Sequence, residues 1–256
     1  MKFVQNTTLL FLVFFLFIQC KKESQQEAEI QSPANEIHYA KGLEIYKHNG
    51  FTIVKITSPW PNAKEQFTYI LQEKNGIIPD SLKQFTAISV PIQSIVVTST
   101  THIPALELLG VENTLVGFPN TDYISSVKTR KLIATGKVRE VGTNETLNTE
   151  VLIDMNPDVI VSFGLNNSNP TLDNLKKSGL KVMLNGDWTE QSPLGKAEWI
   201  KFFGALYGLD SKANTLFSEI EKEYKNTLAL AQKATRKPTV LSGAMYQDQW
   251  FVPQGE

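Results

Sequence analysis

The chain has 256 residues, of which 41% are hydrophobic, so it can bury a core and form one large or two small domains. Its 25 basic and 26 acidic residues leave a net charge of −1 at pH 7. This balance argues against a nucleic-acid partner, because such binding depends on Lys and Arg side chains that neutralise phosphates. The single cysteine excludes a disulfide within these residues.

Residues 1–20 have the pattern of a secretory signal. A lysine precedes the apolar run LLFLVFFLFI at residues 9–18, which is shorter than the ~20 residues that span a bilayer. Cys20 follows directly, so we interpret residues 1–20 as a lipoprotein signal peptide with Cys20 as the lipid-accepting residue. Lipoprotein signals usually have Leu and a small residue where this chain has Phe17 and Gln19. The alternative is a signal that is cleaved nearby, with an incidental cysteine.

Two further regions precede the main body of the chain. Residues 21–40 are polar and lack periodicity, which predicts a disordered tether. Residues 41–92 contain GFTIVKITSPW and EQFTYILQEKNG, which predict two strands joined by a turn rich in Pro and Asn. We expect residues 41–92 to form an N-terminal β-hairpin region.

Residues 93–193 alternate between short apolar runs and helical patterns. The predicted strands are QSIVVTS, TLVGFP, PDVIVSFG and LKVMLNG, and the predicted helices are PALELLG, TEVLIDMN and TLDNLKKSG. Continuously apolar strands separated by helices are typical of a parallel sheet that is covered on both faces. We therefore expect an α/β fold whose first lobe is a Rossmann-like, ligand-binding lobe.

Residues 194–236 are predicted to be connecting helices. PLGKAEWIKFFGALYG is helical, and a second helix is predicted from Asp210, as its N-cap, to about Lys233. This second helix has an apolar stripe at every fourth residue, formed by Leu216, Ile220, Tyr224 and Leu228. At 1.5 Å per residue it is ~36 Å long, which suits a backbone helix between two lobes. Residues 237–256 predict the start of a second α/β lobe, so we expect a fragment of a longer protein.

Polar and aromatic side chains follow the predicted parallel strands. In open α/β sheets, ligands bind at the carboxyl ends of the strands, where helix N-termini offer free N–H groups. Aromatic and small polar groups there suit a bulky, partly apolar ligand. The alternative is a set of ordinary turns whose aromatic rings complete the core. The candidate ligand-binding residues of this lobe are Thr100, Thr101, His102, Tyr123, Phe163 and Trp188.

No motif in the sequence predicts catalysis or a resident metal. The three histidines, His38, His48 and His102, do not have the spacing of a zinc or manganese site. The chain has no G-x-S-x-G, H-E-x-x-H or phosphate-loop motif. We therefore predict no catalytic residues and no cofactor, and we expect a binding protein.

Two stretches carry a resemblance to a known family. They are LNTEVLIDMNPDVIVSFG at residues 147–164 and LGVENTLVGFPN, and the long helix follows them. Residues 93–256 resemble the substrate-binding proteins of ABC importers for iron–siderophore complexes and cobalamin, the helical-backbone metal-receptor family. The resemblance implies a periplasmic protein that captures a metal chelate between two lobes. It also implies delivery to an ABC permease with its ATPase, and here a lipid anchor in the membrane.

The resemblance also implies roles for single residues. Glu150 would dock onto arginines of the permease, and Tyr123 and Phe163 match aromatic ligand contacts of cobalamin-binding members. Trp250 and Gln254 match the first cleft segment of the second lobe, where relatives more often have Gly at the place of Gln254.

Two rival interpretations of the function remain. One is a ligand-capture lipoprotein without a transport role, and the other is a secreted α/β enzyme.

The ligand itself stays open at this point. Anionic catecholate siderophores need cationic partners, but Arg130, Lys131 and Arg139 lie between the predicted elements. Stacking aromatic residues favour a corrinoid. Haem would use Tyr123 or His102 as an axial ligand, and an oxyanion such as molybdate would suit threonines at a helix N-terminus.

Overall fold

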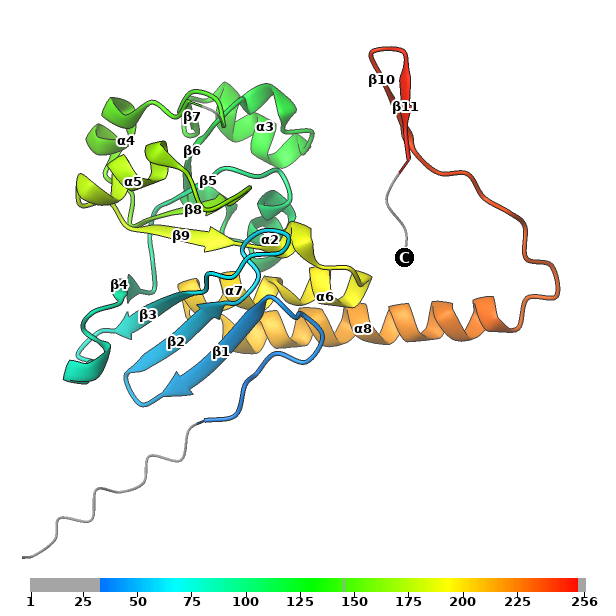
Figure 1. The fold of residues 1–256 in the computed structure, drawn as a ribbon, viewed down its shortest axis with the longest axis horizontal. Coiled ribbons are helices and arrows are strands. Elements are labelled where there is room, and N and C mark those ends of the chain that lie inside the picture. Colours follow the sequence, from blue (N-terminus) through cyan, green and yellow to red (C-terminus); the bar gives the residue numbers. More distant parts are fainter. Residues whose placement is uncertain (1–32, 145, 253–256) are drawn as a thin grey trace, which may run out of the picture. The chain divides into compact units, whose positions relative to one another are not determined.

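The computed structural model describes residues 33–144 and 146–252 (Figure 1). The predicted signal peptide with Cys20, most of the predicted tether, and Gln254 lie outside these described residues. No helix among the described residues has both the length and the apolar character needed to cross a bilayer.

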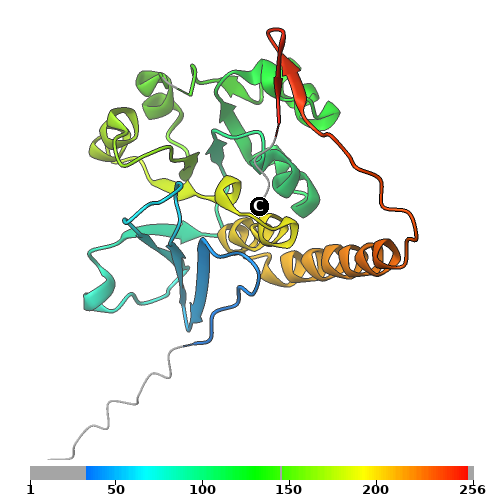
Figure 2. The ribbon, with the colours of Figure 1, turned by 45° about the vertical axis from the view of Figure 1, so that its right-hand side comes forward.

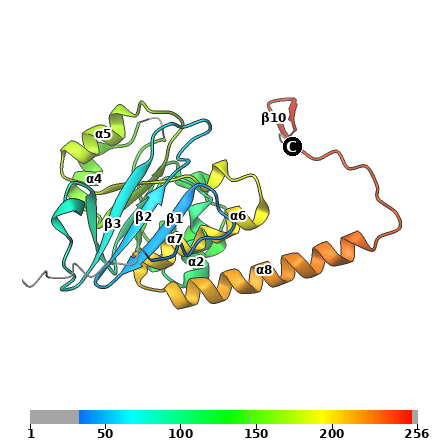
Figure 3. The same ribbon diagram turned by 60° about the horizontal axis from the view of Figure 1, so that its bottom comes forward.

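The first sheet has four strands, in the order β1-β2-β3-β4. Figure 3 shows β1, β2 and β3 side by side. β1, β2 and β3 are antiparallel neighbours, whereas β4 runs parallel to β3. The predicted hairpin is therefore β2–β3, inside a larger sheet. Alternate residues such as Leu43 and Ile45 face the core, as expected for strands with one buried face. The strands are β1 (Leu43–His48), β2 (Phe51–Ile56), β3 (Phe67–Glu73) and β4 (Thr86–Val90).

The second sheet has five strands, all parallel, in the order β7-β6-β5-β8-β9. Its strands are β5 (Ile95–Val97), β6 (Leu115–Phe118), β7 (Arg139–Glu140), β8 (Val159–Phe163) and β9 (Val182–Asn185). Ile95 and Val97 point into one core cluster, whereas Val96 between them points into another. Both faces of the sheet are therefore buried, which explains the continuously apolar runs. The predicted α/β fold with a parallel sheet is confirmed.

Helices cover the two faces of this sheet. Residues of α2 and α7 share the cluster of Ile95, whereas residues of α4 and α5 share the cluster of Val96. Polar side chains begin the helices: the side-chain oxygens of Asn148 and Asn169 accept the backbone N–H of the third helical residue. The helices are α2 (His102–Leu109), α3 (Val127–Ala134), α4 (Thr149–Met155), α5 (Pro170–Lys177), α6 (Pro193–Glu198) and α7 (Ile200–Tyr207).

In addition to β1 and β4 of the first sheet, two elements of the α/β part were not expected from the sequence, namely α3 and β7. Arg130 and Lys131 lie in α3, and Arg139 lies in β7, so the expectation that these cations lie between elements is wrong. α3 is too polar to show a helical apolar stripe, and β7 has only two residues.

The long helix is α8 (Asp210–Gln232), a single helix of 23 residues (Figures 1 and 2). Its N-cap is Leu209, so Asp210 is already helical. Only its first half is packed: Ala213 and Phe217 are buried. The predicted apolar stripe is half-buried at Leu216 and Ile220 but exposed at Tyr224 and Leu228.

Two short strands follow α8 in the chain. β10 (Ala244–Tyr246) and β11 (Gln249–Phe251) form an antiparallel hairpin.

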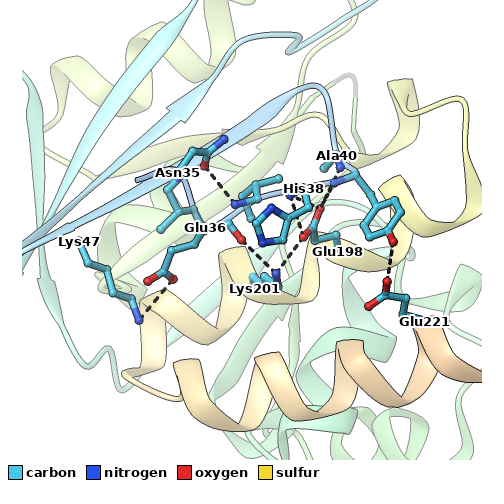
Figure 4. Close-up of polar contacts among 11 residues, drawn as sticks. Asn35, Glu36, His38, Ala40, Lys47, Glu198, Lys201 and Glu221 are labelled. Carbon is cyan, nitrogen blue, oxygen red and sulfur yellow. Dashed lines mark hydrogen bonds and ion pairs between the residues drawn. The ribbon is translucent and has the colours of Figure 1, made fainter. Parts of the chain in front are cut away.

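The end of the predicted tether is ordered, which corrects its boundary at residue 40. The backbone N–H groups of His38, Tyr39 and Ala40 donate to the Glu198 carboxylate at 3.0, 2.6 and 2.9 Å (Figure 4). The Lys201 ammonium donates to the carbonyl oxygen of Glu36 at 3.1 Å. Figure 4 shows these groups converging where the chain enters the first sheet. Buried hydrogen bonds hold this segment, whose polar composition alone predicts disorder.

Candidate functional site

The carboxyl ends of the parallel strands meet at one edge of the second sheet, which we call the rim. β5 and β8 are joined there by the Thr98 hydroxyl, which donates to the Ser162 hydroxyl at 3.0 Å. Since all five strands are parallel, the segments after them emerge on the same side. The sheet thus brings together Thr100 and Thr101 after β5, Tyr123 after β6, Phe163 at the end of β8 and Trp188 after β9.

Tyr123 is the most exposed aromatic residue of this set, with 73% of its surface accessible. It ends the short 3₁₀ helix η3 (Thr121–Tyr123). This turn is fixed from two sides: the Thr121 hydroxyl donates to Glu140 at 2.9 Å, and Arg130 donates to the carbonyl oxygen of Thr121 at 3.0 Å. Arg130 also forms an ion pair with Asp122 at 3.6 Å. Arg130 therefore stabilises the turn that carries Tyr123.

His102 does not share the exposed position of its neighbours Thr100 and Thr101. It is 0% exposed, and its ring lies 5.5 Å from that of Phe203 on α7. Neither ring nitrogen has a hydrogen-bond partner among the described residues. Burial lowers the pKa of His102, and the nearby Asp187 and Asn185 side chains only partly offset this effect. His102 is thus a neutral core residue beneath the rim and not one of its surface residues.

Phe163 borders a pocket of about 310 Å³ at the end of β8. Phe163 itself is half-buried, and Leu165 beside it is 68% exposed. Leu147, Pro170 and Leu172 add further apolar surface to this pocket. The other described side chains that line it are neutral amides and hydroxyls, namely Asn144, Ser162, Asn166, Ser168, Asn169 and Thr171. Such walls can donate and accept hydrogen bonds without a net charge.

Trp188 lies in the 3₁₀ helix η4 (Asp187–Thr189), directly after β9. It is half-buried, and its indole N–H has no hydrogen-bond partner among the described residues. Next to it, Asp187, Thr101 and Lys196 border a second pocket of about 140 Å³. Lys196 is exposed and forms no hydrogen bond or ion pair with any residue that the structure describes. Lys196 is thus a cation at the rim that the sequence pattern did not predict.

The signal that could have identified Lys196 is its place in the chain. It lies in α6, four residues after Ser192, the N-cap of α6, and the loop from β9 leads straight into this helix. The first residues of a helix that follows a parallel strand lie at the rim. The sequence pattern predicts a connecting helix here, and a connecting helix gives no reason to expect its polar residues at a ligand site.

The remaining candidates lie elsewhere. Glu150 is exposed in the first turn of α4, whose N-cap is Asn148. Trp250 lies on β11 and is 50% exposed. No group of three or more His, Cys, Asp or Glu side chains within residues 33–144 and 146–252 could hold a metal ion.

A parallel sheet with aromatic and neutral polar side chains along its rim, followed by a 23-residue helix, has the architecture of a ligand-binding protein. The chain belongs to the periplasmic binding protein family, whose model matches residues 95–255. This result confirms the family that the sequence resembles. The match begins at β5, so the first sheet lies outside it.

Other proteins are similar to the chain in sequence or in fold. Two uncharacterised lipoproteins of Methanocaldococcus jannaschii are 26% and 28% identical to the chain over 242 and 234 residues. These alignments cover 85% and 87% of the chain but 57% of each relative, so the chain spans little more than half their length. A periplasmic binding protein from Veillonella parvula shares the fold, with a TM-score of 0.54 and 15% identity. That alignment covers 81% of the chain and 61% of the Veillonella protein.

Proposed function

We propose that the protein is the substrate-binding component of an ABC importer, which captures a metal chelate and delivers it to a membrane permease. Membership of the periplasmic binding protein family supports this role. The observation that carries the proposal is the convergence of Tyr123, Phe163 and Trp188 at the rim. Flat aromatic side chains offer large, rigid contact areas to a planar or bulky ligand. Trp250 and Gln254 would contact the same ligand from a second lobe.

The chemistry of the rim favours an iron–siderophore complex or a corrinoid. The neutral pocket beside Phe163 suits an uncharged, hydrogen-bonding arm such as an amide. Lys196, at the other pocket, suits one anionic group. Haem and molybdate are the alternative ligands within this family. Tyr123 is the exposed candidate for an axial haem ligand, because His102 is buried.

We propose further that the protein is exported and held at a membrane by a lipid on Cys20. The apolar run before Cys20 supports export, and the relatives from M. jannaschii are themselves named lipoproteins. The permease would then meet Glu150, whose carboxylate is exposed at the start of α4. An exposed carboxylate is available for a charge-assisted bond to a guanidinium group.

Calorimetric titration tests the ligand class. The protein purified from its own cells would be titrated with cobalamin, a ferric hydroxamate, a ferric catecholate, haem and molybdate. We expect heat and tryptophan quenching with one of the first two ligands. If only haem or molybdate binds, the proposed ligand class is wrong, but the role as a substrate-binding protein stands. If none of the five compounds binds, the proposal is contradicted.

A further inference from the structure

The loop between β2 and β3 reaches the rim of the second sheet. Although residues 57–66 lie outside the family match, the hydroxyl of Thr189, in the turn after β9, donates to the carbonyl oxygen of Ser58 at 3.2 Å. A pocket of about 260 Å³ lies between the two segments, bordered by Pro61 and Asn62 on one side and by Gln191 on the other. The first sheet therefore contributes atoms to the surface beside Trp188.

Two glycines show how closely this loop approaches the ends of the strands. A Cβ atom on Gly164, directly after β8, would lie 2.6 Å from a ring carbon of Trp60. A Cβ atom on Gly186, directly after β9, would lie 2.4 Å from the carbonyl oxygen of Ser58. Neither distance leaves room for a side chain, so glycine at both positions allows the loop to pack against the backbone.

Trp60 is fixed firmly enough to act as a wedge between these segments. It is 8% exposed and meets Phe67 edge-on, with ring centroids 5.9 Å apart. It shares a core cluster with buried residues of α5 and β9, and Trp188 packs against this cluster. The flanking residues Pro59 and Pro61 restrict the backbone on both sides of the ring.

We propose that residues 57–62 are a third wall of the ligand site, with Trp60 as a positioning residue for Phe163 and Trp188. The ligand in this inference rests on the proposed function. The packing of Trp60 between the segments after β8 and β9 does not depend on that function. Trp60 holds the segments after β8 and β9 at a fixed separation and so sets the distance between the two rim aromatics. The exposed residues Pro61 and Asn62 extend the contact surface beyond the family core. The wall thereby selects ligands by width.

Hydrogen exchange of the ligand-free protein tests the wedge. Trp60→Ala should speed exchange at least tenfold at residues 163–168 and 186–190. Phe51→Ala is the matched control, because Phe51 is 7% exposed and lies at the far end of β2. Amides of β5 report global unfolding in both variants. Equal exchange in the two variants at the rim segments, after this correction, would overturn the wedge.

Binding tests the third wall. With whichever compound of the titration panel the wild-type protein binds, Trp60→Ala should weaken affinity at least tenfold and narrow the difference between large and small chelates. Trp60→Phe should restore most of the affinity, and Phe51→Ala should leave it within twofold. Unchanged affinity and selectivity in Trp60→Ala would overturn the wall. If the wild-type protein binds no compound, the proposed function fails, whereas the exchange comparison still decides the wedge.

Discussion

The Lys201 ammonium lies 2.8 Å from the Oε1 atom of Glu198, and the side chains of the pair are 10% and 0% exposed. The same carboxylate accepts three consecutive backbone N–H groups, from His38 to Ala40. Burial alone would raise the pKa of Glu198, but the bonds from Lys201 and from the three N–H groups together lower it. Glu198 is therefore ionised in the folded protein, and it joins the segment from His38 to Ala40 to α6 and α7.

Glu198→Gln should lower the free energy of unfolding by about 2–4 kcal/mol, because it leaves Lys201 buried without its counter-charge. Urea denaturation measures this loss. Glu219→Gln on α8 is the control, since Glu219 is exposed and should change stability by less than about 0.5 kcal/mol. Equal midpoints for the two variants would show that the buried pair does not contribute as argued.

His102 should make the protein sensitive to mild acid. Its lowered pKa means that, below its ordinary value of 6.5, the unfolded chain binds a proton that the folded protein does not. The free energy of unfolding should therefore fall as the pH drops below 6.5, by up to about 1.4 kcal/mol per pH unit. Urea midpoints from pH 7.5 to 5 should show this fall and show it reduced in His102→Asn. A slope in His102→Asn that equals the wild-type slope would contradict the burial argument.

Glu150→Ala should leave ligand affinity almost unchanged and reduce uptake into cells. The reason is the loss of a carboxylate–guanidinium pair at the permease, and removal of one partner from such a buried pair costs ~2–5 kcal/mol. Glu223→Ala on α8, which also removes an exposed carboxylate, is the control for uptake. Normal uptake by cells that carry Glu150→Ala would exclude the docking role.

Cys20→Ala should release the protein from membranes. Acyl chains on Cys20 would be the main apolar anchor, at ~0.8 kcal/mol per buried CH₂ group. Membrane fractionation measures the release, and Gln19→Ala should stay in the membrane fraction. Absence of fatty-acid label from the wild-type protein would contradict lipidation.

Phe163→Ala should reduce ligand affinity by ~1–3 kcal/mol, which is the scale for one aromatic contact in an interface. Phe85→Ala is the control, because Phe85 is also half-buried but precedes β4 in the first sheet. Titration calorimetry measures both variants. A loss of the same size in Phe85→Ala would point to a global effect on the fold.

The sequence predicted the parts of the fold that are governed by local patterns. Every strand of the second sheet except β7 appeared as an apolar run, and α8 appeared with nearly its observed ends. α3 was missed because its apolar residues that meet the core, Leu132 and Ile133, are only partly buried, and its one fully buried residue is the polar Thr129. His38 to Ala40 were missed because their order comes from Glu198, about 160 residues further along the chain.

The site was predictable in its position but not in its details. The rule for parallel strands placed five of the six first-lobe candidates at one rim. For His102 a signal was present and overlooked: His102, Leu106 and Leu109 follow helical spacing and are all buried. For Trp60 no such signal exists, since its contact with Gly164 joins two sheets that are separate in the sequence.

The shared core has a consequence for where the protein can be divided. Leu43 and Val54 of the first sheet lie in the same apolar cluster as Ile95 and Phe202 of the family core. A truncated chain that begins at residue 95, where the family match begins, would leave the apolar surface beneath the first sheet open to water. Such a chain should aggregate when expressed, whereas one that begins near residue 34 should remain in solution. The start of the family match and the start of the compact unit at Ala34 thus lie about sixty residues apart, and we expect the start of the compact unit to decide whether an expressed chain stays in solution.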